Sequence, residues 1–199
     1  RQRQMCIRDS LLDAVYFLSF CKSAGNPIDS QNIRHDSDFF VIQGFYEAVD
    51  GTPEEIYCGM KRRQKKQFKR NKKEYTRLSD HIGFLPLVMV SPADSVLISG
   101  GSDERRRFMD VVISQYDKEY LDALIRYNKA LAQRNTLLKS EMPVEEELFL
   151  VWEEMMAQAG EVVFHKREEF IREFIPIFQS FYSFISQDKA VSYTHLRAH

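Results

Sequence analysis

The hydrophobic periodicity of this chain changes once, near residue 92, and this change limits the folds that the chain can adopt. Before it, short runs of β-branched and aromatic residues alternate with turn signals, which is typical of strands. After it, apolar residues recur at helical spacing and no strand pattern is found. The pattern therefore predicts an α/β lobe over residues 11–91, followed by an α-helical lobe over residues 92–188.

The first lobe is predicted to contain a buried helix and a hairpin. Apolar residues from Leu11 to Phe20 form one broad helical face. Phe39–Glu47 has strand composition, Asp50-Gly51 is a strong hairpin turn, and Glu55–Met60 is placed to pair back against the first strand.

The hairpin is predicted to continue as an antiparallel meander. Lys65–Arg70 and Lys73–Thr76 lie on either side of a turn at Asn71, and their weak alternation predicts a sheet with one face in water. A short helix is expected at Leu78–Ile82. The compact apolar run Phe84–Val90 predicts a central strand that leads into the helical lobe.

Helix start and stop signals divide the second lobe. Ser91 is a candidate cap, with Pro92 at the first helical position. Gly100-Gly101 is expected to end that short helix, Ser102 to begin the next, and Asp117 to cap a third. The remaining apolar positions predict long helical hairpins with a seam like that of a coiled coil, formed by Leu148, Trp152, Met155, Ala159, Val162, Phe170, Phe174, Ile177, Phe181 and Ile185.

The net charge of −1 conceals a strongly basic segment. Nine of the thirteen residues from Lys61 to Lys73 are basic, whereas residues 141–164 hold seven acids and no Lys or Arg. Clustered cations bind phosphates by releasing counterions, so this segment is a candidate DNA contact. The alternative is a solvated edge strand whose lysines prevent aggregation. The candidate DNA-binding residues are Lys61, Arg62, Arg63, Lys65, Lys66, Lys69, Arg70, Lys72 and Lys73.

Other classes of protein find little support in the sequence. The three cysteines contain no C-x-x-C pair, which argues against a disulfide framework or a cysteine-rich zinc site and favours a reduced, cytoplasmic compartment. The longest uncharged stretch has fourteen residues, which is too short for a membrane span. His195 and His199 are four residues apart but have no third ligand, so no metal site is expected.

Several long segments resemble the RecF family of bacterial DNA replication and repair proteins, whose ATPase heads are of the ABC and chromosome-maintenance type. These segments are SPADSVLISGGSDERRRFMD from Ser91, SQYDKEYLDALIRYNKALAQRNTLLK from Ser114, LLDAVYFLS from Leu11 and RLSDHIGFLPLVMVSP from Arg77. They occur in the order found in the family and cover roughly residues 11–188. The resemblance implies an incomplete ABC-type head, with a mixed or antiparallel β lobe followed by the helical lobe.

The resemblance also implies a function for the parent protein. RecF-type proteins bind double-stranded and gapped DNA in an ATP-dependent way, with Mg²⁺, and help to load recombinase. The implied partners are DNA, a RecR-type mediator and a second RecF copy in an ATP-dependent homodimer, and the implied location is cytoplasmic, with no membrane contact.

This chain departs from the family pattern at both ends. In the family, a G-x-x-G-x-G-K-T-N loop precedes the first helix, but here Arg8 and Asp9 stand where its lysine and threonine are expected. Residues 1–10 and 189–199 resemble translated adapter sequence and are interpreted as non-native tails of an internal fragment. The signature and Walker B motifs are also absent. The chain as written is therefore expected to bind ATP negligibly, to need no cofactor and to have no catalytic residues.

The junction between the lobes carries a further family match. Arg105 and Arg106 match the paired arginines of G-x-x-x-x-R-R-x-F, and Ser91 and Asp94 match S-P-x-D. These residues either relay the nucleotide state to the helical lobe, or they form a helix cap and local ion pairs with acids such as Asp103. The second interpretation is the simpler one.

Two alternatives to a truncated ATPase head stay open. The chain can be a non-enzymatic nucleic-acid-binding or scaffold module that uses the basic hairpin and the helical arm. It can also be unstable in isolation, because a central strand at residues 84–90 has no predicted neighbours.

Overall fold

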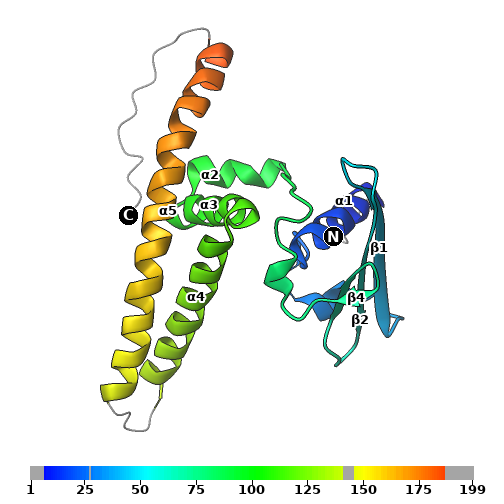
Figure 1. The fold of residues 1–199 in the computed structure, drawn as a ribbon, viewed down its shortest axis with the longest axis horizontal. Coiled ribbons are helices and arrows are strands. Elements are labelled where there is room, and N and C mark those ends of the chain that lie inside the picture. Colours follow the sequence, from blue (N-terminus) through cyan, green and yellow to red (C-terminus); the bar gives the residue numbers. More distant parts are fainter. Residues whose placement is uncertain (1–6, 27, 141–145, 187–199) are drawn as a thin grey trace. The chain divides into compact units, whose positions relative to one another are not determined.

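The chain divides into two compact units in the computed structural model, Arg1–Ser91 and Pro92–His199. The structure describes residues 7–26, 28–140 and 146–186. The first unit is an α/β unit with one antiparallel sheet, and the second is helical (Figure 1). This is the fold class that the sequence predicted. The tails at residues 1–6 and 187–199, which include Cys6, His195 and His199, lie outside the described residues.

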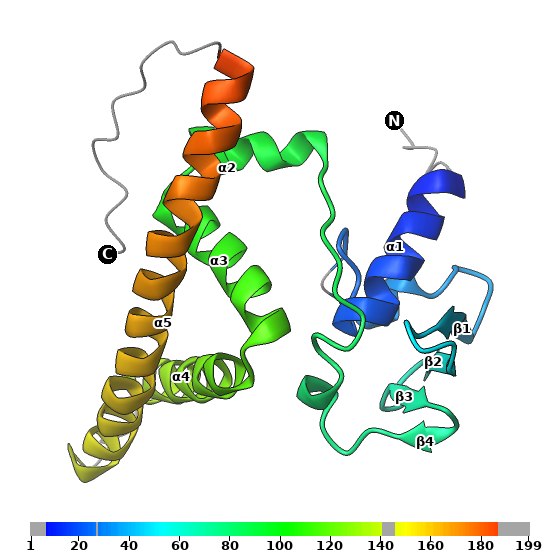
Figure 2. The ribbon, with the colours of Figure 1, turned by 45° about the horizontal axis from the view of Figure 1, so that its top comes forward.

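The sheet of the α/β unit is the predicted meander. Its four strands follow one another in the order β1-β2-β3-β4, and each neighbouring pair is antiparallel. Helix α1 lies across one face of this sheet (Figure 2). The elements are α1 (Ile7–Phe20), β1 (Phe39–Glu47), β2 (Pro53–Lys61), β3 (Gln67–Arg70) and β4 (Lys73–Glu74), with short 3₁₀ turns at Asp29–Asn32 and Leu78–Asp80.

Two tight turns set the register of the meander. The β1–β2 turn contains Gly51, whose φ of 80° lies in the left-handed region that glycine adopts without steric cost. The β3–β4 turn contains Asn71 and Lys72 with φ of 49° and 69°, the two positive values of a type I′ hairpin. Both turns lie where the sequence predicted them.

The core of the α/β unit lies between α1 and the inner face of the sheet. Residues along β1 alternate between exposed and half-buried, as expected for a strand with one face in water. The buried cluster consists of Phe17, Leu18, Cys21, Ile56, Cys58 and Phe68. Only the C-terminal half of α1 contributes to it, so the prediction of a buried first helix is confirmed for that half and was wrong for the N-terminal half. Leu11, Leu12 and Val15 are exposed because nothing in the described residues covers them.

His81 closes one end of this core and is fully buried. Its Nε2 donates to the Leu18 carbonyl oxygen at 2.6 Å. Since that nitrogen carries the proton, Nδ1 accepts from the Tyr75 hydroxyl at 3.0 Å. His81 is therefore a structural residue of the core, with both ring nitrogens hydrogen-bonded.

The predicted central strand at Phe84–Val90 was wrong. Residues 81–85 form turns after the 3₁₀ segment, and residues 86–90 have no regular structure. A strand requires a neighbour for its backbone N–H and C=O groups, and no strand of the four-stranded sheet pairs with this segment. Phe84 and Leu85 still pack on the core, whereas Val88 and Val90 are 78% and 83% exposed.

The helical unit consists of a 3₁₀ turn (Pro92–Ser95), α2 (Val96–Ser99), α3 (Ser102–Tyr116), α4 (Lys118–Leu138) and α5 (Glu146–Ser186). Asp117 caps α4 as predicted, since its carboxylate accepts from the Tyr120 backbone N–H at 2.9 Å. Helix α4 packs along the first half of α5 (Figures 1 and 2).

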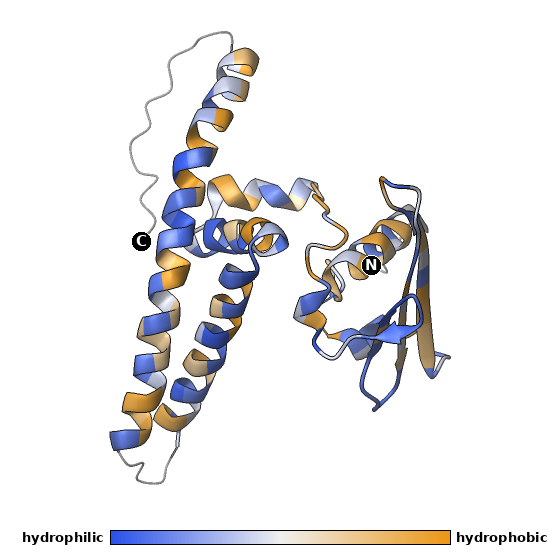
Figure 3. Cartoon of the chain, in the orientation of Figure 1, coloured by the Kyte–Doolittle hydropathy of each residue, from blue (hydrophilic) through white to orange (hydrophobic). Residues whose placement is uncertain are grey.

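The predicted seam holds over only part of α5. Met109, Ile113, Tyr120, Ala123 and Val163 form a buried cluster, and Phe170 packs against it. Beyond Pro176, which lies inside the helix, Ile177, Phe181 and Ile185 are exposed, because no described helix lies alongside them. Apolar residues nevertheless continue to the end of α5 (Figure 3). None of the helices in the described part of the chain is long and apolar enough to cross a membrane.

Candidate nucleic-acid interface

The basic segment lies around β3, the shortest of the interior strands. Lys61 ends β2, Arg62–Lys66 form the β2–β3 loop, Lys72 lies in the tight β3–β4 turn, and Lys73 begins β4. The fold therefore separates the basic run into a loop cluster and a turn cluster at opposite ends of β3, with Lys69 and Arg70 between them. The nine candidate residues differ sharply in what their side chains contact.

Lys66 points into the α/β unit rather than toward solvent. Its Nζ donates to the Cys21 carbonyl oxygen at 2.5 Å and to Asp29 Oδ2 at 2.6 Å. It also lies 4.9 Å from the centroid of the Phe17 ring, and its side chain is only 12% exposed. A cation is favourable at the C-terminal end of α1, where carbonyl groups have no partner in the helix. Lys66 is therefore a structural residue.

Arg70 is also used internally. Its Nε donates to Glu54 Oε2 at 2.8 Å, its Nη2 pairs with Glu54 Oε1, and the guanidinium carbon lies 3.7 Å from the centroid of the Phe84 ring. Asn71 donates to the same carboxylate at 2.8 Å. The hydrogen bond from Arg70 is the main reason that the pKa of Glu54 is lowered. This bidentate pair locks β2 to the β3–β4 turn.

Arg62 and Lys69 occupy intermediate positions. Arg62 donates to the backbone carbonyls of Ser37 at 3.0 Å and Arg34 at 3.2 Å, which ties the β2–β3 loop to the segment before β1 while the residue stays exposed. Lys69 lies on the outer face of the sheet, with its Nζ 5.6 Å from the centroid of the Tyr57 ring.

The other five basic residues face solvent. Lys61, Arg63, Lys65, Lys72 and Lys73 are all exposed, and within the described residues none of them forms an ion pair. Their charges are therefore available to a polyanion. The sequence could not separate these residues from Lys66 and Arg70, because the partners of the inward-facing cations lie 37 and 16 positions away.

Two of the residues predicted at the junction, Arg105 and Arg106, make local contacts within the helical unit. Arg105 Nη1 donates to the Gly100 carbonyl oxygen at 3.1 Å, which satisfies an orphan group at the end of α2. Arg106 forms an ion pair with Asp103, one turn earlier in α3. Asp94 lies in the first turn of the 3₁₀ segment that follows Ser91. The contacts of Arg105 and Arg106 are local, as in the simpler interpretation. The cap at Ser91 and a relay of the nucleotide state stay predictions.

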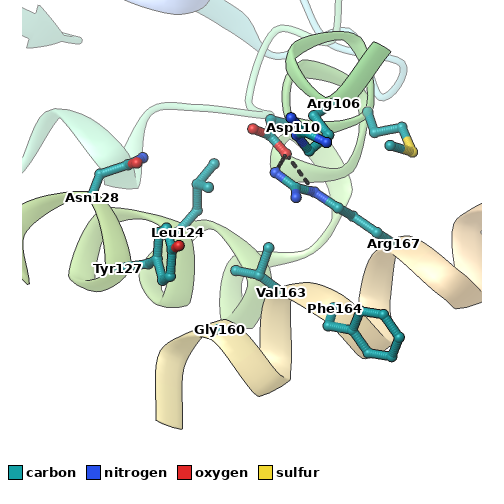
Figure 4. Close-up of a pocket in the computed structure, with 10 residues that line it drawn as sticks. Arg106, Asp110, Leu124, Tyr127, Asn128, Gly160, Val163, Phe164 and Arg167 are labelled. Atoms are coloured by element: carbon teal, nitrogen blue, oxygen red, sulfur yellow. Dashed lines mark hydrogen bonds and ion pairs between the residues drawn. The ribbon is translucent and has the colours of Figure 1, made fainter. Parts of the chain in front are cut away.

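A pocket of about 490 Å³ lies between α3, α4 and α5. Figure 4 shows Arg167 pointing from α5 toward Asp110 on α3. Arg167 donates to Asp110 Oδ1 from Nη2 at 2.6 Å, and Tyr120 on α4 joins both residues. Burial, followed by the hydrogen bond to Asp110, raises the pKa of Tyr120. Arg167 and Asp110 pair with each other, and Tyr120 contacts both, so these three residues link α3, α4 and α5. We call them the three-helix clamp. Sequence analysis missed it, although Arg167 is a cation within an apolar seam.

The described residues do not form a phosphate cradle. Helix α1 begins at Ile7 with Arg8 and Asp9 in its first turn, and no glycine or lysine lies among residues 7–12. Nor do His, Cys, Asp or Glu side chains gather into a metal-binding group in this part of the chain. Burial raises the pKa of the Cys21 and Cys58 thiols to about 12, so both are poor nucleophiles at neutral pH.

Comparisons with known proteins identify the relatives of this chain. No family model matches it. Over 182 residues it is 90% identical to the DNA replication and repair protein RecF of Bacteroides fragilis, covering 92% of this chain and 49% of that protein. RecF of Parabacteroides distasonis is 57% identical over 178 residues, covering 89% of this chain and 48% of that protein. The chain thus spans about half the length of the curated relatives it matches.

Solved structures give the same result for the fold. A structure of the recombination mediator protein RecF with ATP in the RecFOR pathway is 28% identical, with a TM-score of 0.84, over 94% of this chain and 53% of that one. A second RecF structure, described as RecF-ATPrS, is 29% identical with a TM-score of 0.82, over 89% of this chain and 48% of that one.

Proposed function

This chain belongs to the RecF family, and from that premise we propose that it forms part of a DNA-binding head that acts in DNA replication and recombinational repair. The observation that carries the proposal is the set of five exposed cations around β3: Lys61, Arg63, Lys65, Lys72 and Lys73. Cations of this kind bind the phosphate backbone through counterion release, without reading sequence.

The wider activity belongs to the whole RecF protein. We propose that the head binds double-stranded DNA and gapped junctions in an ATP-dependent way, with a RecR-type mediator as partner, and that it promotes the loading of recombinase. ATP-dependent homodimerisation and a cytoplasmic location are part of the same proposal. The family membership and the ATP named in the related solved structure support it.

The test replaces three exposed cations at the end of β2 and in the β2–β3 loop, and compares them with three matched cations elsewhere. The variant Lys61→Gln, Arg63→Gln, Lys65→Gln is expected to lower the slope of log affinity against log salt for a duplex by about 2.7, which is about 0.9 for each lost phosphate contact. The control is Arg126→Gln, Lys129→Gln, Lys139→Gln in the helical unit, whose parent side chains are also exposed. Fluorescence anisotropy over a salt series gives both slopes. Equal slopes in the two variants would contradict the proposal.

Nucleotide is expected to have no effect on this chain by itself. Residues 7–12 offer no glycine turn and no lysine, so Mg-ATP is expected neither to bind measurably nor to change duplex affinity. Isothermal titration with Mg-ATP measures this directly. Micromolar affinity for Mg-ATP would contradict this expectation.

A further inference from the structure

The outer face of the meander carries exposed apolar residues that do not pack into the core. Phe39 and Val41 are 61% and 47% exposed, and both belong to the outward-facing set of β1. Their partners on β2 are Lys61 and Gly59, which lie on the same face. A strand face in water normally carries polar residues, so these apolar positions require an explanation.

Tyr57, which is half-buried, extends this apolar surface. A Cβ atom built on Gly59 would lie 2.6 Å from the Tyr57 hydroxyl oxygen and 3.0 Å from its Cε1, so the ring lies along the sheet above Gly59. Gly59 pairs with Val41, and Phe39 is the next outward position on β1, about 7 Å further along. The absence of a side chain at residue 59 therefore leaves room for the Tyr57 ring over Gly59, on the strand position paired with Val41.

Positive charge is concentrated at this end of the outer face. Lys61 is directly opposite Phe39, and Lys69 is opposite Tyr57 with its Nζ near the ring. Arg63 and Lys65 follow in the adjoining loop. The outward acids Glu47 and Glu55 lie toward the other end of the β1–β2 pair, and Glu74 on β4 is opposite Lys69. Phe45, 76% exposed, lies at the acidic end opposite Glu55.

We propose that the basic end of this outer face, formed by Phe39, Val41, Tyr57, Lys61 and Lys69, binds the bases of an unpaired DNA strand. Flat-lying aromatic rings stack with bases, and adjacent lysines hold the backbone that links them. Bases in a duplex are already stacked on one another, so only an unpaired strand can use the rings. The inference rests on the proposed function and adds the substrate class: an unpaired strand on the aromatic positions of this face and duplex on the exposed cations around β3, with Lys61 common to both surfaces.

Charge favours this occupant over a protein. An exposed apolar patch is also typical of protein docking surfaces. Here, however, Phe39 is paired across the strands with Lys61, and Tyr57 with Lys69, whereas Phe45 is paired with Glu55. A polyanion with aromatic groups is complementary to the first arrangement and is repelled by the second.

The test compares the two ends of the same face. In the 199-residue chain, Phe39→Thr with Tyr57→Thr keeps strand-forming residues and is expected to weaken oligo(dT) binding by about tenfold or more, while duplex binding and its salt slope stay unchanged. Phe45→Thr is the matched control and is expected to change neither. Tyr57→Phe retains the ring and is expected to retain affinity. Circular dichroism melting of each variant confirms that the sheet is intact.

A direct readout is available because Trp152 is the only tryptophan. In a Trp152→Phe background, Tyr57→Trp is expected to show quenched emission when oligo(dT) stacks on the indole, and Phe45→Trp is expected to show none. The inference is overturned if the Phe39→Thr, Tyr57→Thr variant keeps its affinity for oligo(dT). It is also overturned if Phe45→Thr lowers that affinity equally. Either result would favour a protein partner for this face. Loss of all DNA binding by the unmodified chain would instead contradict the proposed function. Duplex binding without single-strand binding would contradict this inference alone.

Discussion

The two units use their charged residues in opposite ways. In the helical unit, cations bridge helices: Arg167 joins Asp110 and Tyr120, Lys166 contacts Asp117 at 2.8 Å, and Arg134 contacts Glu153 at 2.8 Å. In the α/β unit, two cations are used internally and five face solvent around β3. Helical charges therefore hold the unit together, whereas most charges of the basic segment remain available to a ligand.

The largest effect on stability is expected from removal of the three-helix clamp. Arg167→Met leaves the Asp110 carboxylate and the buried Tyr120 hydroxyl without their cation, which is expected to cost about 3 kcal/mol of unfolding free energy. Urea unfolding followed by Trp152 emission reports on α5. Arg172→Met, which breaks an exposed pair of 3.8 Å with Glu168, is the control and is expected to cost less than about 0.5 kcal/mol. Similar losses in both variants would show that Arg167 is not a clamp.

A smaller effect is expected from two neighbouring lysines that the structure assigns to different tasks. Lys66→Met removes the donor to Asp29 and to the end of α1, and it is expected to destabilise the α/β unit by about 2 kcal/mol. Lys65→Met is expected to leave stability unchanged and to lower the salt slope of duplex binding by about 0.9. Amide hydrogen exchange in β2 and β3 measures the first effect, and anisotropy measures the second. The assignment fails if Lys65→Met is the more destabilising variant.

The smallest expected effect is a dependence of stability on acid pH in the α/β unit. The hydrogen bond from Arg70 lowers the pKa of Glu54 from its ordinary value of 4.5. The pair therefore contributes stability that is fully present above that value and is lost as pH falls through the lowered pKa of the folded state. Wild type is expected to lose more stability than Glu54→Gln between neutral pH and about pH 3, as measured by urea midpoints. Parallel pH profiles would rule out this contribution.

Local signals in the sequence identified much of the fold. Strand β1 was predicted with its observed bounds because its β-branched and aromatic run ends at a glycine turn. The cap at Asp117 and the turn at Asn71 also depend on residues within four positions of each other. The strand predicted at Phe84–Val90 was wrong because composition describes only one partner of a pairing. The helical spacing of ten apolar residues in α5 likewise did not show where the packing of this helix ends.

By itself, the sequence determined the local elements, the family and the basic character of the β3 region. Only the tertiary structure decided which of those cations are available, since Lys65 and Lys66 are chemically alike and adjacent. Lys66 is held by a carboxylate and a helix end that lie far from it in the sequence, whereas Lys65 meets only solvent. The same holds for the outer face, where alternation identifies two sides of β1 but only α1, packed on one of them, defines which side is open. Contacts between residues far apart in the sequence decide which side chains are buried, and such contacts leave no pattern in the local sequence.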